Sequence, residues 1–367
     1  MKKLIFRKLY QDITIFFLTA LLIIGLIVWT IQAVNYFDIV TEDGHGLKIY
    51  FYYSILNFPK IIERIFIFIF FIANFYIIIS YESKNEMVIF WVNGIKKIKF
   101  VNKLLVFSCL ILIFQIIFSA YITPFSKLKA RDYLKSSDMT FFTSLLKAGK
   151  FINVTKGLTI FINEKKEDGT FEDIFLEEVK NNYTKMIYAN KGFIYNDDKF
   201  KVLKLFDGRV INIDKNKINL FNFEEINFNL NDLESKSITV PKIQEIDTKI
   251  LLSCFFEIKN EIFELFKCNE NSIKEVKTEL IKRLFKPFYI PLIVLLTCFL
   301  IIISKNNEIY KNYVYFIFII NFLILVLSEI SIKYAVISIS HMILYFLSPI
   351  ILFIAGYFLL YKFTKNV

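Results

Sequence analysis

The chain has 367 residues, of which 56% are hydrophobic and 18% aromatic, and its mean hydropathy is +0.51. This composition is too apolar for a soluble globular protein and indicates an integral membrane protein with a smaller polar part. A net charge of +11 would suggest a nucleic-acid partner in a soluble chain, but here the Lys and Arg residues mostly flank apolar segments. Orientation in a membrane explains them better, and we expect no nucleic-acid partner.

Six apolar segments approach the roughly 20 residues that a helix needs to cross a bilayer. Three precede a polar stretch of about 160 residues and three follow it, at approximately residues 13–34, 61–80, 104–122, 288–303, 313–332 and 342–361. The first is too long for a signal-peptide core, and no small-residue cleavage site follows it, so it is expected to be an uncleaved anchor. Pro124 is expected to close the third segment.

The basic residues predict the orientation of these segments. About 13 of them lie in the N-terminal tail, the loops 82–103 and 305–311, and the C-terminal tail, whereas the opposite loops carry few. Because short cytoplasmic loops are enriched in Lys and Arg, both termini are predicted to be cytoplasmic. The large polar segment is then predicted to lie outside the cytoplasm.

The polar segment has the pattern of a β domain. Short runs of Ile, Val, Phe and Tyr alternate with turn signals at Asp168-Gly169, Asn190-Lys-Gly192, Asn196-Asp-Asp198 and Asp207-Gly208. This spacing predicts a sandwich or jelly roll, although the alternation around Phe171, Ile174 and Leu176 is less regular. The paired acids Asp197-Asp198 and Glu224-Glu225 are interpreted as solvated turns. From residue 247 the pattern becomes helical and leads into the fourth apolar segment.

Signatures of catalysis are missing from the sequence. There is no phosphate-binding Walker loop, no Gly-x-Ser-x-Gly and no metalloprotease helix, and the two histidines, His45 and His341, are far apart. Cys254 and Cys268 lie in the polar part and can pair in an oxidising compartment, but unpaired thiols are expected. We therefore expect no enzyme activity, metal or cofactor, and if the protein works against a gradient, the energy must come from a partner.

The loop between the second and third segments predicts a docking surface. At helical period, Met87, Trp91 and Gly94 fall on one side, while Glu82 and Glu86, four residues apart, fall on another. A short amphipathic helix over residues 82–94 is therefore predicted at the membrane face, where it can meet a soluble protein.

Three motifs, in this order, resemble the lipopolysaccharide export permeases of the LptF/LptG (YjgP/YjgQ) type, LptF more than LptG. They are Glu86-Met-Val-Ile-Phe-Trp-Val-Asn-Gly94, the segments 149–162 and 168–175, and Glu279-Leu-Ile-Lys-Arg283. The second motif is similar to the beginning of the family's β-jellyroll, and the third to its Glu-x-x-x-Arg element. The chain departs from the family where the second span opens with Pro59 but lacks a second proline a few residues later.

The resemblance implies a fold with six transmembrane helices (3+3) and an inserted periplasmic β-jellyroll-like domain. Residues 1–123 would hold helices 1–3 and a cytoplasmic coupling helix near 82–94, residues 124–284 the periplasmic domain and a connecting helix, and residues 285–367 helices 4–6. It also implies the permease subunit of an ABC transporter in the bacterial inner membrane. The implied partners are an LptG-like second permease, an LptB-like cytosolic ATPase dimer that uses the ATP, LptC/LptA-like bridge proteins and lipopolysaccharide.

The resemblance also assigns roles to residues. Glu86 would be the acid that meets the ATPase, Gly94 would end that helix, and Glu82 is a weaker companion. Lipid phosphates would be bound by cations at the outer ends of the spans, with Arg283 the strongest candidate beside Lys60, Arg64, Lys282, Lys286 and Lys333. The alternative for these cations is snorkelling and local pairing, for instance Glu279 with Arg283 on one helix.

Two other functions remain open at this level. A permease for another lipid or lipoprotein would share much of the topology. A membrane insertase or signalling receptor belongs to another class, but a receptor should carry a cytoplasmic output domain. The longest loop predicted inside is only about 25 residues long.

Overall fold

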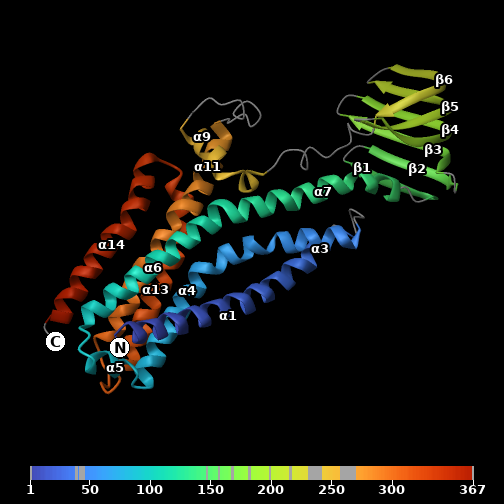
Figure 1. Cartoon of the computed structure of the whole chain (residues 1–367). Coiled ribbons are helices and arrows are strands. Elements are labelled where there is room, and N and C mark those ends of the chain that lie inside the picture. Colours follow the sequence, from blue (N-terminus) through green and yellow to red (C-terminus); the bar gives the residue numbers. More distant parts are fainter. Residues whose placement is uncertain are drawn as a thin grey trace. The chain divides into compact units, whose positions relative to one another are not determined.

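The structure, a computed structural model shown in Figure 1, comprises two compact units. It describes residues 2–37, 40, 46–145, 148–155, 158–166, 169–180, 183–197, 200–214, 217–229, 242–256 and 270–365. The helical unit contains Met1–Ala33, Ser54–Lys129 and Lys242–Val367, and the sheet unit contains Val34–Tyr53 and Ala130–Pro241. The sequence grouped residues 242–284 with the polar domain. Their contacts in the structure assign them to the helical unit instead.

Within the described residues, six helical segments are long and apolar enough to span a membrane, as the sequence predicted. Pro59 lies in the first turn of the second segment, where a proline costs no helical hydrogen bond. The segments are α1 (Lys2–Tyr36), α3 with α4 (Leu47–Leu56, Phe58–Ser83), α6 with α7 (Lys97–Ile117, Thr123–Leu145), α11 with α12 (Glu270–Leu280, Tyr289–Thr297), α13 (Tyr310–Ala335) and α14 (Ile339–Lys365).

Helix α12 lies at the centre of the helical unit. It packs against α4, α6, α13 and α14, and Ile290, Leu292 and Leu295 are completely buried. A helix that is apolar on all sides is expected in such a position. The outer helices α1, α13 and α14 instead expose many large apolar side chains, as helices facing lipid do.

The third segment does not end at Pro124, so that prediction is wrong. A π-turn at Phe118–Ile122 precedes the proline, and α7 continues to Leu145. Pro124 has no N–H for the carbonyl of Ala120, four residues earlier, and the hydroxyl of Thr248 donates to that carbonyl instead. The lost helical bond is replaced by a side chain from elsewhere in the fold, so the chain can remain helical.

A second π-turn, Ile281–Phe285, repeats this arrangement before Pro287. The proline cannot donate to the carbonyl of Arg283, and the hydroxyl of Ser119 donates to it at 2.8 Å. Since Ser119 belongs to the first π-turn, the two irregular segments are joined to each other. They position the polar groups described below.

The sheet unit contains six antiparallel strands, paired in sequence order. They are β1 (Lys150–Thr155), β2 (Leu158–Lys165), β3 (Thr170–Lys180), β4 (Tyr183–Asp197), β5 (Phe200–Asp214) and β6 (Lys217–Asn229). One core of buried side chains, which includes Ile160, Leu176, Ile187 and Leu205, holds them together. The sheet between the third and fourth membrane segments is consistent with the predicted jellyroll-like domain.

The irregular alternation in β3 has a local cause. Asp173 has a φ of 50°, and the buried side chains change parity there, from Phe171 to Ile174. Asp207 in β5 has a φ of 48°, and the parity changes likewise between Leu205 and Val210. The two long strands therefore bend and turn opposite faces towards one core.

Three predicted turns are wrong, because in each case a strand continues through the residues. Asn190-Lys-Gly192 lies within β4, Asp207-Gly208 within β5 and Glu224-Glu225 within β6. A Cβ on Gly208 would lie 2.1 Å from the carbonyl oxygen of Tyr188, so glycine is required by the close approach of two strands. Glycine and aspartate here mark bends in strands and not their ends.

The cysteines differ from the prediction at one position. Cys254 is disulfide-bonded, so the expectation of an unpaired thiol there is wrong. Cys109 and Cys298 are free, as expected for thiols within apolar segments. Cys268 and His45 lie outside the described residues.

Candidate functional site

Helix α5 (Met87–Val92) connects the second and third membrane segments. Its inner side is anchored by Met87 and Phe90, both buried, and the ring of Phe90 packs edge-on against Phe100 at 5.0 Å. Its outer side presents Val88, Ile89 and Val92, the last 80% exposed. The helix is therefore anchored on its inner side, and its outer side exposes an apolar surface that the described part of the chain does not cover.

The predicted helix over residues 82–94 is shorter in the structure. Asn85, with a φ of 60°, separates Glu82 at the end of α4 from Glu86 at the start of α5. The two acids therefore do not share a face of one helix, and that prediction is wrong. Gly94 follows α5 with a φ of 66°, and its N–H donates to the carbonyl of Trp91 at 2.9 Å. The glycine thus lies where the helix ends, as expected.

The surroundings of the two acids are different. The Glu82 carboxylate accepts a hydrogen bond from the backbone N–H of Lys305 at 3.1 Å, and the Lys305 ammonium donates to the carbonyl of Ser83 at 2.9 Å. Glu82 thus ties α4 to the segment before α13. For Glu86, half-buried, the described residues supply no hydrogen bond or ion pair to the carboxylate. Glu86 is the acid that remains available to a partner.

Charged side chains from four membrane segments surround a cavity of about 260 Å³ in the helical unit. Four of the six predicted cations lie there, as do three carboxylates, and an unpredicted lysine joins them: Lys60, Arg64, Lys282 and Lys286, Glu63, Glu279 and Glu329, and Lys127. Lys333 is exposed on α13 and is not among the lining residues. The structure therefore brings together most, but not all, of the predicted cations.

Arg283 is held by the protein itself. It is only 1% exposed, and its Nε donates to Glu279 at 3.0 Å, which confirms the predicted local pair. Its Nη1 donates to the carbonyl of Ile246 and to the hydroxyl of Thr248, both at 2.9 Å, and its Nη2 to the carbonyl of Gln244 at 3.0 Å. Four of the five N–H donors of this buried guanidinium are thus occupied by the protein, so the structure does not support Arg283 as the strongest ligand contact.

One further cation is paired within this chain, and another lies near two of its carboxylates. The ammonium of Lys286 pairs with the Glu329 carboxylate at 2.6 Å. Lys127 is 9% exposed and lies within the field of Glu63 and Glu279. Sequence reasoning missed Lys127 because it ended the third segment before this residue. Among the described residues, no carboxylate forms an ion pair with the other three cations of the cavity, which are Lys60, Arg64 and Lys282.

The chain is a multi-pass membrane protein with a sheet domain inserted between its two sets of helices. Among the described residues, no group of three or more His, Cys, Asp or Glu side chains is placed to hold a metal ion. The family model "Lipopolysaccharide export system permease LptF/LptG" matches residues 7–362, and the chain therefore belongs to this family. A search of curated proteins found no match. As a member of this family, the chain is a transport component, a lipopolysaccharide export permease, and not an enzyme.

Proposed function

We propose that the chain is the permease subunit of an ABC transporter that extracts lipopolysaccharide from the inner membrane and passes it to a periplasmic bridge for export to the outer membrane. The observation that carries this proposal is α5, in a family of export permeases: it has an exposed apolar side, and the Glu86 carboxylate before it has no hydrogen-bond or ion-pair partner among the described residues. The other parts of the proposal follow from where energy enters and where the lipid is bound.

Energy would enter at α5. An LptB-like cytosolic ATPase dimer would contact Val88, Ile89 and Val92, and a cation of the ATPase would pair with Glu86. Phe90 is packed against Phe100, so a displacement of α5 is transmitted to the beginning of α6. Closure of the ATPase on binding nucleotide would shift the helices from one state to another through contacts at α5 that differ between the two states.

The lipid would be bound at the charged cavity. Lys60, Arg64 and Lys282 offer donors to lipid phosphates, and Lys286 can exchange Glu329 for a phosphate oxygen. In the sheet unit, Phe151, Phe161, Phe175 and Tyr188 form a row across β1 to β4 beside a cavity of about 1000 Å³. This row is a candidate surface for acyl chains, since the core of the sheet is filled by packed side chains.

The disulfide of Cys254 supports an extracytoplasmic position for residues 242–256, because disulfides persist in oxidising compartments. Both termini and α5 would then be cytoplasmic, in agreement with the distribution of Lys and Arg. An LptG-like second permease and LptC/LptA-like bridge proteins complete the proposed assembly.

Purification under mild detergent tests the proposal. We expect the full chain to recover a soluble ATPase and a second six-span protein. Glu86→Lys should lose the ATPase but keep the second permease, because it places a cation opposite a cation. Glu82→Gln is the matched control, since its amide oxygen can still accept from Lys305. Recovery of the chain alone, or of the ATPase in equal amount with Glu86→Lys, would contradict the proposal.

A further inference from the structure

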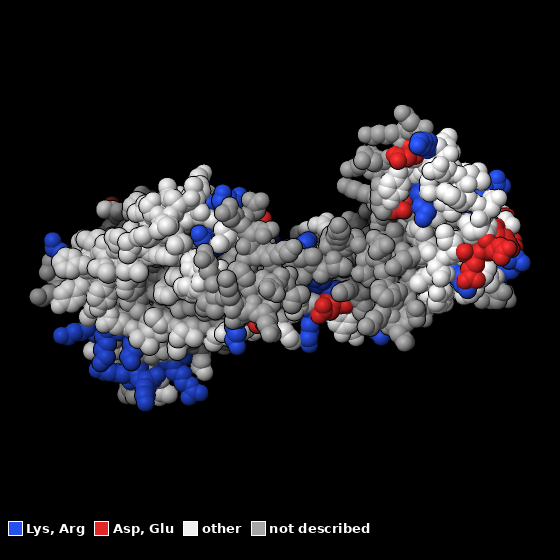
Figure 2. Space-filling model, turned by 90° about the horizontal axis from the view of Figure 1, so that it is seen from above, with Lys and Arg blue, Asp and Glu red and all other residues white. Residues whose placement is uncertain are grey.

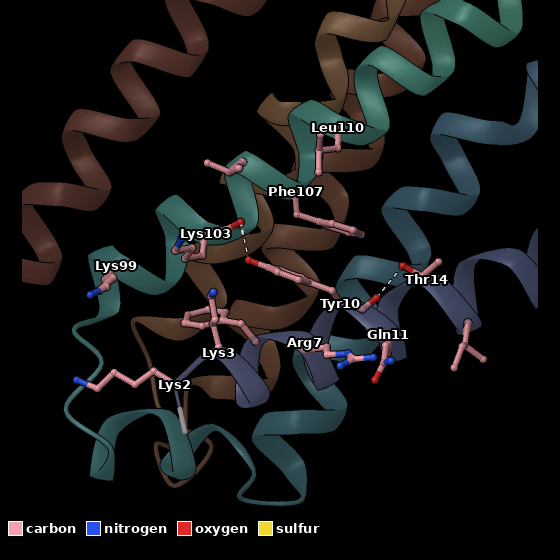
Figure 3. Close-up of a pocket in the computed structure, with 13 residues that line it drawn as sticks. Lys2, Lys3, Arg7, Tyr10, Gln11, Thr14, Lys99, Lys103, Phe107 and Leu110 are labelled. Atoms are coloured by element: carbon pink, nitrogen blue, oxygen red, sulfur yellow. Dashed lines mark hydrogen bonds between the residues drawn. The ribbon is translucent and has the colours of Figure 1, made fainter.

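A groove of about 870 Å³ lies between α1 and α6, separate from the charged cavity. Both helices belong to the helical unit. The groove is polar at one end and apolar at the other: Figure 3 shows Lys2, Lys3, Lys99 and Lys103 at one end and Leu110 towards the other. The proposed transport function gives this groove no role.

The polar end carries positive charge only. Lys2, Lys3, Arg7, Lys99 and Lys103 line it, and no Asp or Glu is among its described lining residues. In Figure 2, Lys and Arg side chains gather on part of the helical unit with no acid visible among them. The nearby acid of α1, Asp12, accepts a hydrogen bond from the Tyr81 hydroxyl and does not line the groove.

The apolar end is a hydrocarbon surface. Ile15, Val106 and Leu110 line it, and each is 61% exposed. Between the two ends, α1 contacts α6: the rings of Tyr10 and Phe107 stack at 4.8 Å, and the Tyr10 hydroxyl donates to the carbonyl of Lys103 at 3.0 Å. Figure 3 shows this contact between the two helices. These contacts join the two helices that form the groove.

From these two ends we infer that the groove binds an anionic glycerophospholipid. Its phosphate would lie among the five cations, and an acyl chain would lie along Ile15, Val106 and Leu110. Basic pockets between transmembrane helices bind such headgroups, and the charge makes a zwitterionic lipid a poorer occupant. A free phosphate would leave the apolar surface uncovered.

The bound lipid would lie close to α5. Phe6 lines the groove, and its ring packs edge-on against Phe90 at 5.5 Å. The occupant is thus separated from α5 by one side chain. The inference does not depend on the proposed ATPase or on the bound lipopolysaccharide, and it can be tested on the chain alone.

Native mass spectrometry of the purified full chain, mixed in detergent with phosphatidylglycerol or phosphatidylcholine, tests the inference. We expect preferential retention of phosphatidylglycerol, reduced about tenfold or more when Arg7, Lys99 and Lys103 are all changed to Gln. The matched control changes Lys8, Lys96 and Lys362 to Gln, which removes the same charge from exposed residues outside the groove and should retain the lipid.

A second pair of variants tests the apolar end. Leu110→Trp fills the groove and should reduce retention, whereas Ile113→Trp, on the exposed side of the same helix but outside the groove, should not. Each variant must elute as a single species, and Arg7→Gln alone replaces the triple variant if that aggregates. Glycerol phosphate at the same concentration should not displace the lipid.

Four results would overturn the inference. They are equal retention of the two phospholipids, equal loss in the matched control, displacement by glycerol phosphate, and displacement by lipopolysaccharide at equal concentration. The last would assign the groove to the transported lipid. Failure to recover an ATPase, by contrast, would contradict the proposed function and leave this inference unaffected.

Discussion

The burial of the Arg283 side chain is explained by its hydrogen-bond partners. A cation near the end of a membrane segment can bind a ligand or pair locally, and its spacing of four residues from Glu279 gave no means to separate the two roles. The structure supplies four partners from two parts of the chain: Glu279 on the same helix, and Gln244, Ile246 and Thr248 within residues 242–256. The residue joins the start of the fourth membrane segment to residues 242–256.

Arg283→Gln should therefore destabilise the helical unit by about 3–5 kcal/mol, the usual cost of breaking a buried ion pair. Thermal unfolding in detergent would report it as a lower Tm. Lys282→Gln, one residue earlier and half-buried at the charged cavity, should leave the Tm unchanged but weaken crosslinking to lipopolysaccharide. A normal Tm for Arg283→Gln together with lost crosslinking would return Arg283 to the role of ligand contact.

At the scale of elements, the two π-turns explain how helices continue past prolines. Each proline removes a donor, and the orphaned carbonyl finds a hydroxyl, Thr248 for Ala120 and Ser119 for Arg283. The hydroxyls come from segments distant in the sequence, so the irregular turns are stable only when the helices are assembled.

The second turn offers a double-mutant test. Ser119→Ala should cost about 1–3 kcal/mol, because the buried carbonyl of Arg283 loses its donor. In a Pro287→Ala background the cost should be much smaller, since residue 287 then supplies an N–H to that carbonyl. Ser328→Ala is the control, because its hydroxyl donates to the Leu325 carbonyl within one regular helix. Equal costs in both backgrounds, from unfolding measurements, would refute the explanation.

The bends in the sheet make a prediction for the β strands. Gly208→Ala should destabilise the sheet unit by several kcal/mol, at least the roughly 1–3 kcal/mol of an overpacked site, because the strands approach too closely for a Cβ. Gly46→Ala, with open space around its Cα, serves as the control. Limited proteolysis would show cleavage within residues 150–229 for the first variant only. Resistance equal to that of the native chain would show that the bend tolerates a side chain.

At the scale of the whole molecule, orientation across the membrane is the main prediction. A cysteine at Lys191, exposed in β4, should react with a membrane-impermeant thiol reagent in cells whose outer membrane has been made permeable. A cysteine at Lys84, exposed between α4 and α5, should react only after the inner membrane is opened. The reverse pattern would place α5 outside the cytoplasm and exclude its contact with a cytosolic ATPase.

The sequence was sufficient to predict the six membrane segments, their order around a β domain, and Gly94 as the residue that ends the helix between the second and third segments. These features are local, because hydropathy, charge bias and a helix-ending glycine act over one or two turns. The family resemblance was carried by motifs of the same kind.

The three-dimensional structure was needed to show which charges among the described residues have partners within the chain. It paired Glu82 with Lys305, enclosed Arg283, added Lys127, and converted the apparent turns at Asn190 and Asp207 into bends within strands. Each outcome depends on atoms distant in the sequence, such as the hydroxyl of Thr248, whose position no local pattern encodes. Burial and hydrogen bonding therefore separated structural charges from those left to bind a partner or a lipid.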